Sequence, residues 1–132
     1  MFHSNCNSNI MENTRNLGHD VRPWGGYFVL YDGPECKVKK IIVNPGQKLS
    51  YQYHHKRQEV WTVVKGTLTI ILDDDKVFRN YGESIKIPLG ARHRAWNETD
   101  EQVEFIEVQT GTYFGEDDII RIQDDYNRED NE

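Results

Sequence analysis

The sequence predicts an all-β domain, folded as an antiparallel sandwich or barrel. Short runs of strand-forming residues recur about every eight to twelve residues, which is the spacing typical of antiparallel β domains. Gly, Pro, Asn and Asp separate these runs, and these residues favour turns. No segment of twelve residues shows a helical period. The chain therefore carries the pattern of a domain made mainly of strands.

Nine runs supply the expected strands, in chain order. They are residues 26–31, 36–43, 49–54, 59–64, 67–72, 76–79, 84–88, 93–96 and 103–109. The first run ends at an Asp-Gly-Pro turn and the second at Asn-Pro-Gly. The fifth ends at three consecutive aspartates, and the seventh runs into Pro-Leu-Gly. Each strand is thus bounded by residues that end strands.

The chain divides into a tail and one domain. Residues 1–16 are rich in Asn and Ser and lack any period, which predicts a disordered tail. A length of 132 residues suits one hydrophobic core, so residues 17–132 are expected to form a single domain. The one helical candidate is GEDDIIRIQDD, residues 115–125, because its acids cluster where a helix dipole favours them. We therefore expect a short C-terminal helix.

Composition excludes several classes of partner. The formal net charge is −6, which argues against nucleic acid. No apolar stretch approaches 18 residues, so no membrane partner is expected. The two cysteines form no Cys-x-x-Cys pair, which favours unpaired thiols in a reducing cytoplasm.

A dense group of polar side chains interrupts the strand pattern between residues 52 and 59. On a strand, residues two apart share a face, so Gln52 and His54 point together and His55 points away. Residues 55–58 are charged and are expected to form a loop. Glu59 shares its face with Trp61, so a barrel would bury this carboxylate. A buried carboxylate needs a partner, and a metal ion would supply one.

A second group of residues, between 82 and 97, completes a recognisable pattern. Pro88 and Gly90 predict a tight turn before the strand that begins at His93. The spacing of Gly82, Pro88, Gly90, His93 and Asn97 resembles the second cupin motif. The spacing of Gly46, Gln52, His54, Glu59 and Gly66 resembles the first cupin motif, with Gln52 where most cupins have His. The resemblance implies a cupin double-stranded β-helix, also called a jelly roll.

Five further segments narrow the resemblance to one cupin subgroup. They are residues 22–27, 37–41, 49–61, 106–121 and 124–128. They resemble the cupin domain of type II mannose-6-phosphate isomerases, which is often fused behind a mannose-1-phosphate guanylyltransferase and is expected to stand alone here. The printed sequence has no glycine-rich phosphate loop, so guanylyltransferase activity is not implied. Val60 and Asn127 depart from the subgroup, which usually has His and Gly there.

The resemblance implies a metal site and a reaction. The implied ligands are Gln52, His54, Glu59 and His93. Two imidazoles and two oxygens suit a borderline divalent metal, zinc first, with manganese, cobalt, nickel or iron as alternatives. The implied reaction interconverts mannose 6-phosphate and fructose 6-phosphate through an enediol. An open coordination position on the metal would polarise the carbonyl.

The remaining site residues are assigned from strand faces and the resemblance. Glu107 is the candidate base, and it shares a face with Gln109, a candidate substrate contact. Lys39 and Arg22 are the candidate phosphate ligands, because the resemblance places a lysine and an arginine there. Lys39 is also assigned to the catalytic group.

Two other functions stay open, together with the oligomeric state. The same fold could serve another sugar- or nucleotide-sugar-modifying enzyme, such as an epimerase. It could also serve a non-catalytic metal cupin that binds a sugar phosphate. Runs such as LTIIL, residues 68–72 with Thr67 before them, have apolar residues on both faces, which favours a homodimer.

Overall fold

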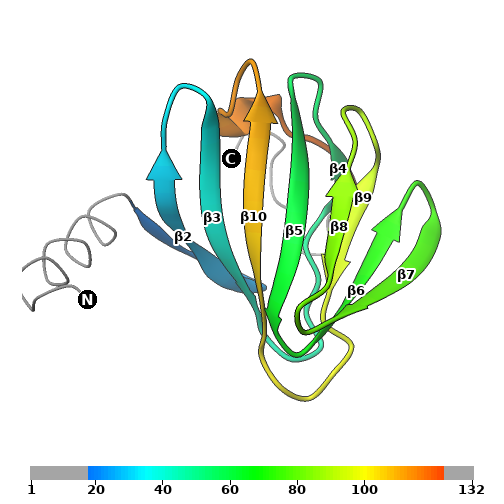
Figure 1. Cartoon of the computed structure of the whole chain (residues 1–132). Coiled ribbons are helices and arrows are strands. Elements are labelled where there is room, and N and C mark those ends of the chain that lie inside the picture. The colour runs from blue at the N-terminus through cyan, green and yellow to red at the C-terminus, as the bar shows by residue number, and fades with distance from the viewer. Residues whose placement is uncertain (1–17, 124–132) are drawn as a thin grey trace, which may run out of the picture.

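The computed structural model describes residues 18–123 of the chain as two antiparallel sheets. One sheet has the strand order β1-β2-β3-β10-β5-β8, and the other has the order β11-β4-β9-β6-β7 (Figure 1). The strands are β1 (His19–Arg22), β2 (Gly25–Asp32), β3 (Cys36–Val43), β4 (Tyr51–Tyr53), β5 (Arg57–Lys65), β6 (Thr67–Leu72), β7 (Asp75–Asn80), β8 (Ser84–Ile87), β9 (His93–Trp96), β10 (Val103–Gly111) and β11 (Ile120–Gln123). The expected all-β jelly roll is confirmed.

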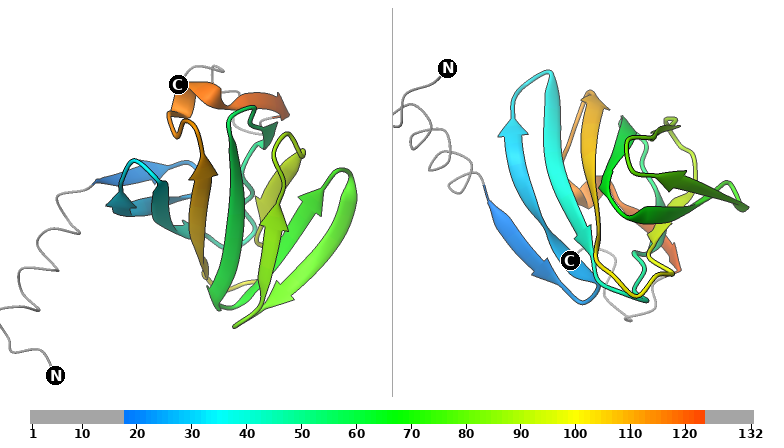
Figure 2. Two further views of the ribbon diagram at one scale, coloured as in Figure 1. Left: turned by 45° about the horizontal axis from the view of Figure 1, so that its top comes forward. Right: turned by 60° about the horizontal axis from the view of Figure 1, so that its bottom comes forward.

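The two sheets curve around a shared interior (Figure 2). Alternation along the strands fills most of this interior with apolar side chains. In β5, Trp61 and Val63 are buried, and in β10, Val103 and Phe105 are buried. Leu68 and Ile70 of β6 pack into the same core from the opposite sheet.

The same alternation carries polar side chains inward at one end of the barrel. Glu59 follows the inward face of β5, and Glu107 and Gln109 follow that of β10. Lys39 of β3 lies on the inward face beside Ile41. Strand register brings these residues together, because Glu107 pairs with Lys39 on one side and Gln109 pairs with Glu59 on the other. The interior is therefore apolar at one end and polar at the other.

The segment after β10 differs from the sequence prediction. The helix expected over residues 115–125 is a single 3₁₀ turn, η1 (Glu116–Asp118), and Ile120–Gln123 forms β11. β11 pairs with β4 across the upper end of the molecule in Figure 1. A helix there would leave this edge of β4 without backbone partners, so tertiary pairing overrides the local helical preference. β1 is also a strand that the sequence pattern did not indicate.

Two predictions fall wholly or partly outside the described residues. The predicted disordered tail, residues 1–16, lies outside residues 18–123, and so do both ends of the predicted domain 17–132. Within residues 18–123, the structure contains no helix long and apolar enough to cross a membrane.

Asn97, the last residue of the second motif, ties the end of β9 to two other segments. Its side-chain amide donates to the carbonyl oxygens of Val43 and Glu101 at 2.9 and 2.6 Å. Its carbonyl oxygen accepts from the backbone N–H of Thr99 at 2.9 Å and from the Thr99 hydroxyl at 2.7 Å. Asn97 is fully buried, so water cannot take over these hydrogen bonds if the side chain is removed.

Replacing Asn97 by alanine should therefore destabilise the fold. We expect Asn97→Ala to lower the free energy of unfolding by about 3 kcal/mol, because buried carbonyl groups lose their donors. Asn80→Ala, at an exposed asparagine of β7, should cost less than about 1 kcal/mol. Urea unfolding measures both values, and equal losses at the two positions would contradict this role for Asn97.

Candidate metal centre and adjoining pocket

Three buried side chains meet inside the polar end of the barrel. His54 follows β4, Glu59 lies in β5 and His93 begins β9. The His54 Nε2 atom is 3.2 Å from Glu59 Oε2, and His93 Nε2 is 3.9 Å from Glu59 Oε1. One donor atom from each residue lies within 4.8 Å of the other two. All three side chains are at most 2% exposed, so the structure brings together three of the four expected ligands in one dry cluster.

Backbone carbonyl groups orient both imidazole rings. The Nδ1 atom of His93 is 2.9 Å from the Ala91 carbonyl oxygen, and that of His54 is 3.4 Å from the Asp118 carbonyl oxygen. For His93, this contact assigns the ring proton to Nδ1 and leaves Nε2 free, whereas the Nε2 atom of His54 lies within hydrogen-bond distance of Glu59 Oε2. Burial lowers the pKa of His93 to about 4, so this ring is neutral near pH 7. A neutral imidazole with a free Nε2 atom, as at His93, is what a metal requires.

Gln52, the fourth expected ligand, pairs in register with His93. The Gln52 Oε1 atom and the His93 Nε2 atom are both buried without a hydrogen-bond partner. Buried polar atoms rarely lack partners, because each such atom forfeits its hydration. A cation would satisfy both atoms and also the Glu59 carboxylate. Two nitrogens and two oxygens, with no thiolate among them, fit a borderline divalent metal.

Arg57 is a member of the site that the sequence prediction placed in a loop. It is instead the first residue of β5, and its side chain is 3% exposed. Its Nε donates to Glu59 Oε2 at 3.0 Å, and its Nη2 lies 3.5 Å from His54 Nε2. The strand pattern contained this signal, because Arg57 lies two residues before Glu59 and therefore shares its face. The guanidinium contacts the same donor atoms that would contact a metal.

The charge of Glu59 is stabilised by its neighbours. Burial opposes its ionisation, yet hydrogen bonds from His54 and Glu107 and the charge of Arg57 hold the pKa of Glu59 well below its usual range. The Trp61 indole N–H also donates to Glu59 Oε1 at 2.8 Å. Glu59 is therefore a carboxylate at the centre of the cluster.

Glu107 lies beside Glu59, and its pKa is raised where that of Glu59 is lowered. Burial, the charge of Glu59 and their mutual hydrogen bond raise the pKa of Glu107 to about 8. The Gln109 amide donates to Glu107 Oε1 at 2.8 Å. One member of this carboxyl pair is thus ionised while the other holds a proton near neutral pH.

A pocket lies next to the His54–Glu59–His93 cluster, and three residues that surround the cluster also line this pocket. Gln52, Arg57 and Glu107 line the pocket on the side of the cluster. The remaining lining residues are Arg22, Trp24, Tyr27, Lys39, Ile41, Leu49, Ser50, Glu116, Ile119 and Arg121. Four of the thirteen are cationic and two are acidic, although the whole chain carries a net charge of −6. The pocket has a volume of about 60 Å³, which is room for several waters, because roughly 10–15 Å³ suffices for one.

The expected phosphate ligands, Lys39 and Arg22, both lie against the ring of Tyr27. The Lys39 ammonium is 4.2 Å from the centroid of the Tyr27 ring, and the Arg22 guanidinium carbon is 5.5 Å from it. Arg22 Nη2 lies 3.6 Å from Asp20 Oδ2, and its side chain is 31% exposed, whereas Lys39 is buried. Gln109, the other expected substrate contact, is fully buried behind Glu107 and is not among the lining residues.

The turn η1 supplies two acids that the sequence prediction placed in a helix and gave no role in the site. The Asp118 carboxylate accepts the backbone N–H groups of His55 and Lys56 at 3.2 and 3.0 Å. Glu116 Oε2 lies 3.2 Å from the Lys39 ammonium and 3.7 Å from Arg57 Nη1. Only these tertiary contacts reveal that the two acids reach the site. His55 is exposed, as predicted.

Two curated proteins are similar to this chain over most of its length. A mannose-1-phosphate guanylyltransferase from Sinorhizobium fredii is 42% identical over 109 residues, which are 83% of this chain and 21% of that protein. The alginate biosynthesis protein AlgA from Pseudomonas aeruginosa is 44% identical over 115 residues, 87% of this chain and 24% of that protein. The chain thus spans about a fifth to a quarter of the length of these relatives.

Solved structures share the fold. The capsular polysaccharide assembling protein CapF from Staphylococcus aureus superposes with a TM-score of 0.69 at 22% identity, covering 81% of this chain and 34% of that chain. A sugar phosphate isomerase of the cupin superfamily from Silicibacter pomeroyi superposes with a TM-score of 0.60 at 25% identity, covering 71% of this chain and 69% of that chain.

The family comparison agrees with the fold and with both motifs. Residues 9–124 match the family described as "Mannose-6-phosphate isomerase C-terminal", and this match includes the whole described barrel. The chain therefore belongs to the mannose-6-phosphate isomerase C-terminal family of cupin domains.

Proposed function

We propose that the chain is a metal-dependent isomerase that interconverts mannose 6-phosphate and fructose 6-phosphate. One observation carries this proposal: the His54–Glu59–His93 cluster lies beside a pocket rich in cations. Glu107 and Arg57 line the pocket and also lie next to Glu59. The family membership supports the same reaction. The curated relatives are much longer proteins named for guanylyltransfer or polysaccharide biosynthesis, so the isomerase activity is assigned here from the site.

The pocket favours an anionic substrate. Four of its lining residues are cationic and two are acidic, on a chain that is acidic as a whole. We assign the phosphate to Lys39 and Arg22, which both lie against the ring of Tyr27. Lysine offers a point charge and arginine a planar fork, and both are common phosphate ligands. This places the phosphate end of the substrate away from the cluster and the carbonyl end toward it.

The metal ligands in this proposal are Gln52, His54, Glu59 and His93. The two orphaned atoms, Gln52 Oε1 and His93 Nε2, support it, and zinc is the first candidate, with manganese, cobalt, nickel and iron as alternatives. A bound divalent cation would act as a Lewis acid that polarises the substrate carbonyl.

Glu107 is assigned the transfer of the proton between C2 and C1 of the sugar. It is a buried carboxyl group in the pocket wall next to Glu59, and Gln109 fixes its orientation through Oε1. Lys39 pairs with Glu107 in register, and its positive charge favours the ionised form of Glu107 that accepts the proton. The surrounding side chains of Trp24 and Ile41 limit the access of water to the reacting carbons.

A coupled assay for fructose 6-phosphate tests this function directly. Purified protein should convert mannose 6-phosphate after loading with a divalent metal, and chelation should abolish turnover. His93→Ala should lower metal affinity by about 100-fold or more, since even indirect ligand support is worth 10–100-fold. His55→Ala, at the exposed neighbouring histidine, should leave metal affinity unchanged.

The same experiment separates the other functions. Turnover of nucleotide sugars but not of mannose 6-phosphate would indicate a different sugar-modifying enzyme. Metal and mannose 6-phosphate binding without any turnover would indicate a non-catalytic binding module. A protein that converts mannose 6-phosphate equally well after complete metal removal would contradict the proposed mechanism.

Replacing Glu107 isolates the proton-transfer role. Glu107→Gln keeps the shape and the contact with Gln109 but removes the proton carrier. We expect kcat to fall by about 100-fold or more, with metal binding retained. Steady-state kinetics and metal titration measure the two effects, and near-normal turnover would remove Glu107 from the mechanism.

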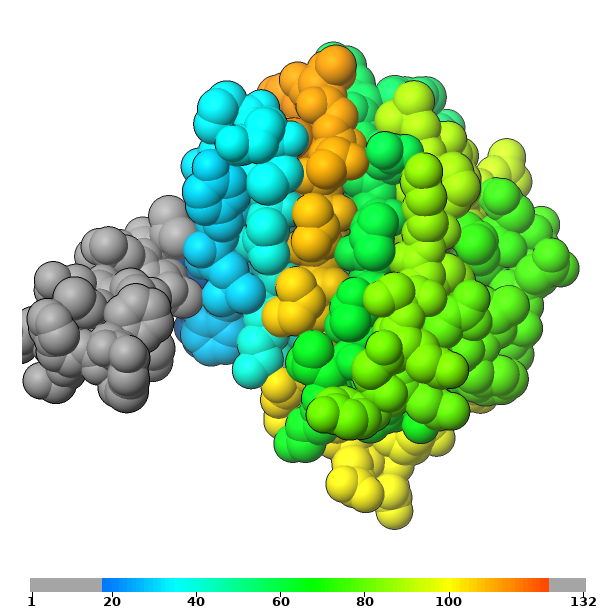
Figure 3. Space-filling view, viewed as in Figure 1, coloured from blue at the N-terminus to red at the C-terminus, as the bar shows by residue number. Residues whose placement is uncertain are grey.

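We also propose that the chain forms a homodimer, and that it acts in the cytoplasm without a nucleic-acid partner. The supporting surface is the outer face of the six-stranded sheet, which faces the viewer in Figure 3. The strand β6 offers less support than the sequence suggested, because Leu68 and Ile70 are buried in the core. Alternation places seven apolar residues on this outer face: Phe28, Val38, Ile42, Val60, Val64, Ile106 and Val108.

These apolar side chains form a connected surface of suitable size and charge. Val38, Val108 and Val60 pair in register across three adjacent strands. Four strands of eight or nine residues cover roughly 500 Å² of flat sheet, which approaches the ~800 Å² per partner of stable interfaces. Lys40 and Glu104 pair with each other at 2.9 Å, so this part of the face is neutral and can meet its own copy about a two-fold axis.

The dimer interface can be tested by one charged substitution. Light scattering at micromolar concentration should give twice the chain mass of 15.6 kDa for the wild type. Val60→Lys should give the monomer mass, because it buries a charge at the centre of the interface. Phe78→Lys, at an exposed residue of the other sheet, should remain dimeric. A monomeric wild type, or a folded dimeric Val60→Lys protein, would contradict this interface.

A further inference from the structure

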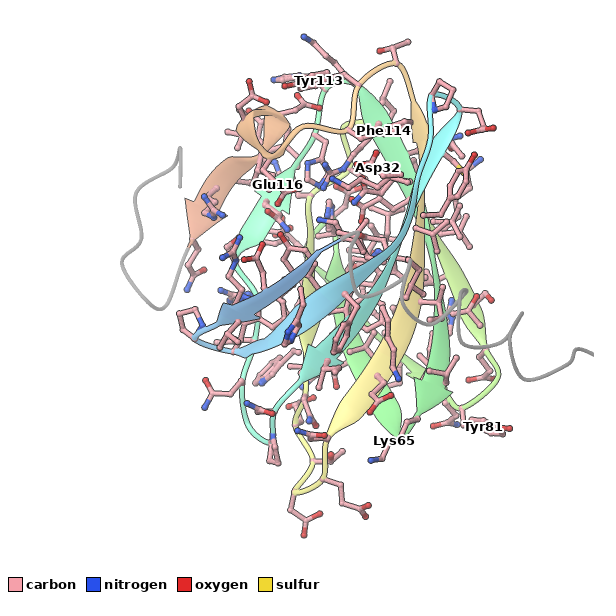
Figure 4. All side chains as sticks on the ribbon, turned by 90° about the vertical axis from the view of Figure 1, so that its left-hand side faces the viewer. Asp32, Lys65, Tyr81, Tyr113, Phe114 and Glu116 are labelled. Carbon is pink, nitrogen blue, oxygen red and sulfur yellow. The ribbon has the colours of Figure 1, made fainter. Side chains whose placement is uncertain are left out.

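A carboxylate of the chain itself bridges two cations of the pocket. The Oε2 atom of Glu116 lies 3.2 Å from the Lys39 ammonium and 3.7 Å from Arg57 Nη1. Both cations are nearly buried, at 4% and 3% side-chain exposure, whereas the Glu116 side chain is 34% exposed. Figure 4 shows Glu116 on the side of the η1 turn that faces the strands. The acid therefore reaches inward from the surface to cations that are fixed in the barrel.

We propose that Glu116 is an internal anion that occupies the phosphate position, and that an anionic ligand binds by replacing it. This inference rests on the proposed assignment of Lys39 to the substrate phosphate. A buried ammonium without an anion nearby is costly, so some negative charge must accompany Lys39 in the free protein. Glu116 supplies that charge, and an incoming phosphate would supply it in the complex.

The surroundings of Glu116 allow this replacement without disturbing the metal ligands. Asp118, two residues later, is buried and holds the backbone of His55 and Lys56, and its carbonyl group contacts His54. The Glu116 side chain is partly exposed, so it can rotate toward solvent while Asp118 keeps the turn in place. Phosphate exchange and metal binding should therefore respond separately to substitution of Glu116.

The replacement also selects ligands by charge. A ligand must compete with a carboxylate that is tethered beside Lys39 and therefore has a high effective concentration. A phosphate group carries about −1.5 to −2 charges at pH 7 and three acceptor oxygens, so it can displace a single carboxylate. A monoanion such as acetate gains nothing over Glu116. Glu116 thus acts as a specificity-determining residue that admits phosphorylated ligands and rejects monoanions.

Charge removal at two neighbouring acids tests the inference. Glu116→Gln should lower the dissociation constant for inorganic phosphate and for mannose 6-phosphate by about 10-fold, as measured by isothermal titration calorimetry of the full chain. Glu116→Gln should also bind acetate measurably, unlike the wild type. Asp117→Asn is the matched control, because Asp117 is an exposed acid of the same turn that contacts only the Tyr113 hydroxyl among the described residues. It should leave all three affinities unchanged, and metal affinity should be the same in all proteins.

The outcomes distinguish this inference from the proposed function. Phosphate affinity in Glu116→Gln that is equal to or weaker than in the wild type would overturn the inference, whether or not the wild type isomerises sugar. Tighter phosphate binding by Glu116→Gln, without isomerase activity in any of the proteins, would uphold the inference and reject the function. Glu116→Ala, which removes the whole carboxylate group, must change phosphate affinity in the same direction. Tighter binding by Asp117→Asn as well would assign the effect to general charge and overturn the inference.

Discussion

The buried carboxylate of Glu59 is the constraint on which the rest of the polar interior depends. A carboxylate at 1% exposure is stable only if positive or hydrogen-donating groups surround it. Arg57, Trp61 and His54 all direct polar atoms at it, and each comes from an element that the barrel holds rigidly. Burial and the charge of Glu59 together raise the pKa of Glu107 and so keep a proton on it near pH 7. One ionised group thus determines the protonation and orientation of its neighbours.

The guanidinium of Arg57 and a divalent metal cannot both be close to the same carboxylate oxygen without repulsion. Arg57 provides positive charge that Glu59 needs. A metal bound by the two histidines would provide that charge as well, so Glu59 would no longer depend on Arg57. Two charged contacts near the pocket are therefore exchangeable. A metal can replace Arg57 as the positive partner of Glu59, and a phosphate can replace Glu116 as the negative partner of Lys39.

Much of the fold followed from local sequence patterns, and the site followed in part. Turn residues marked the ends of nine strands, and alternation correctly placed Glu59 inside and put Glu107 and Gln109 on one face. The same alternation would have placed Arg57 inside, but its charge favoured a loop. Glu116 and Asp118 were beyond sequence reasoning, because their roles arise from contacts over 60 or more residues of sequence separation. Likewise β11 exists because β4 offers an unpaired edge, which no local pattern encodes.

Anomalous X-ray scattering from crystals of the metal-loaded protein tests the central claim most directly, since the claim is that the buried charge of Glu59 serves a metal. We predict a single anomalous peak within about 2.0–2.2 Å of His54 Nε2, His93 Nε2, a Glu59 oxygen and Gln52 Oε1. We also predict that metal binding lengthens the 3.0 Å hydrogen bond from Arg57 Nε to Glu59 Oε2. A cluster without an anomalous peak, with the Arg57–Glu59 contact intact at saturating metal, would contradict the account.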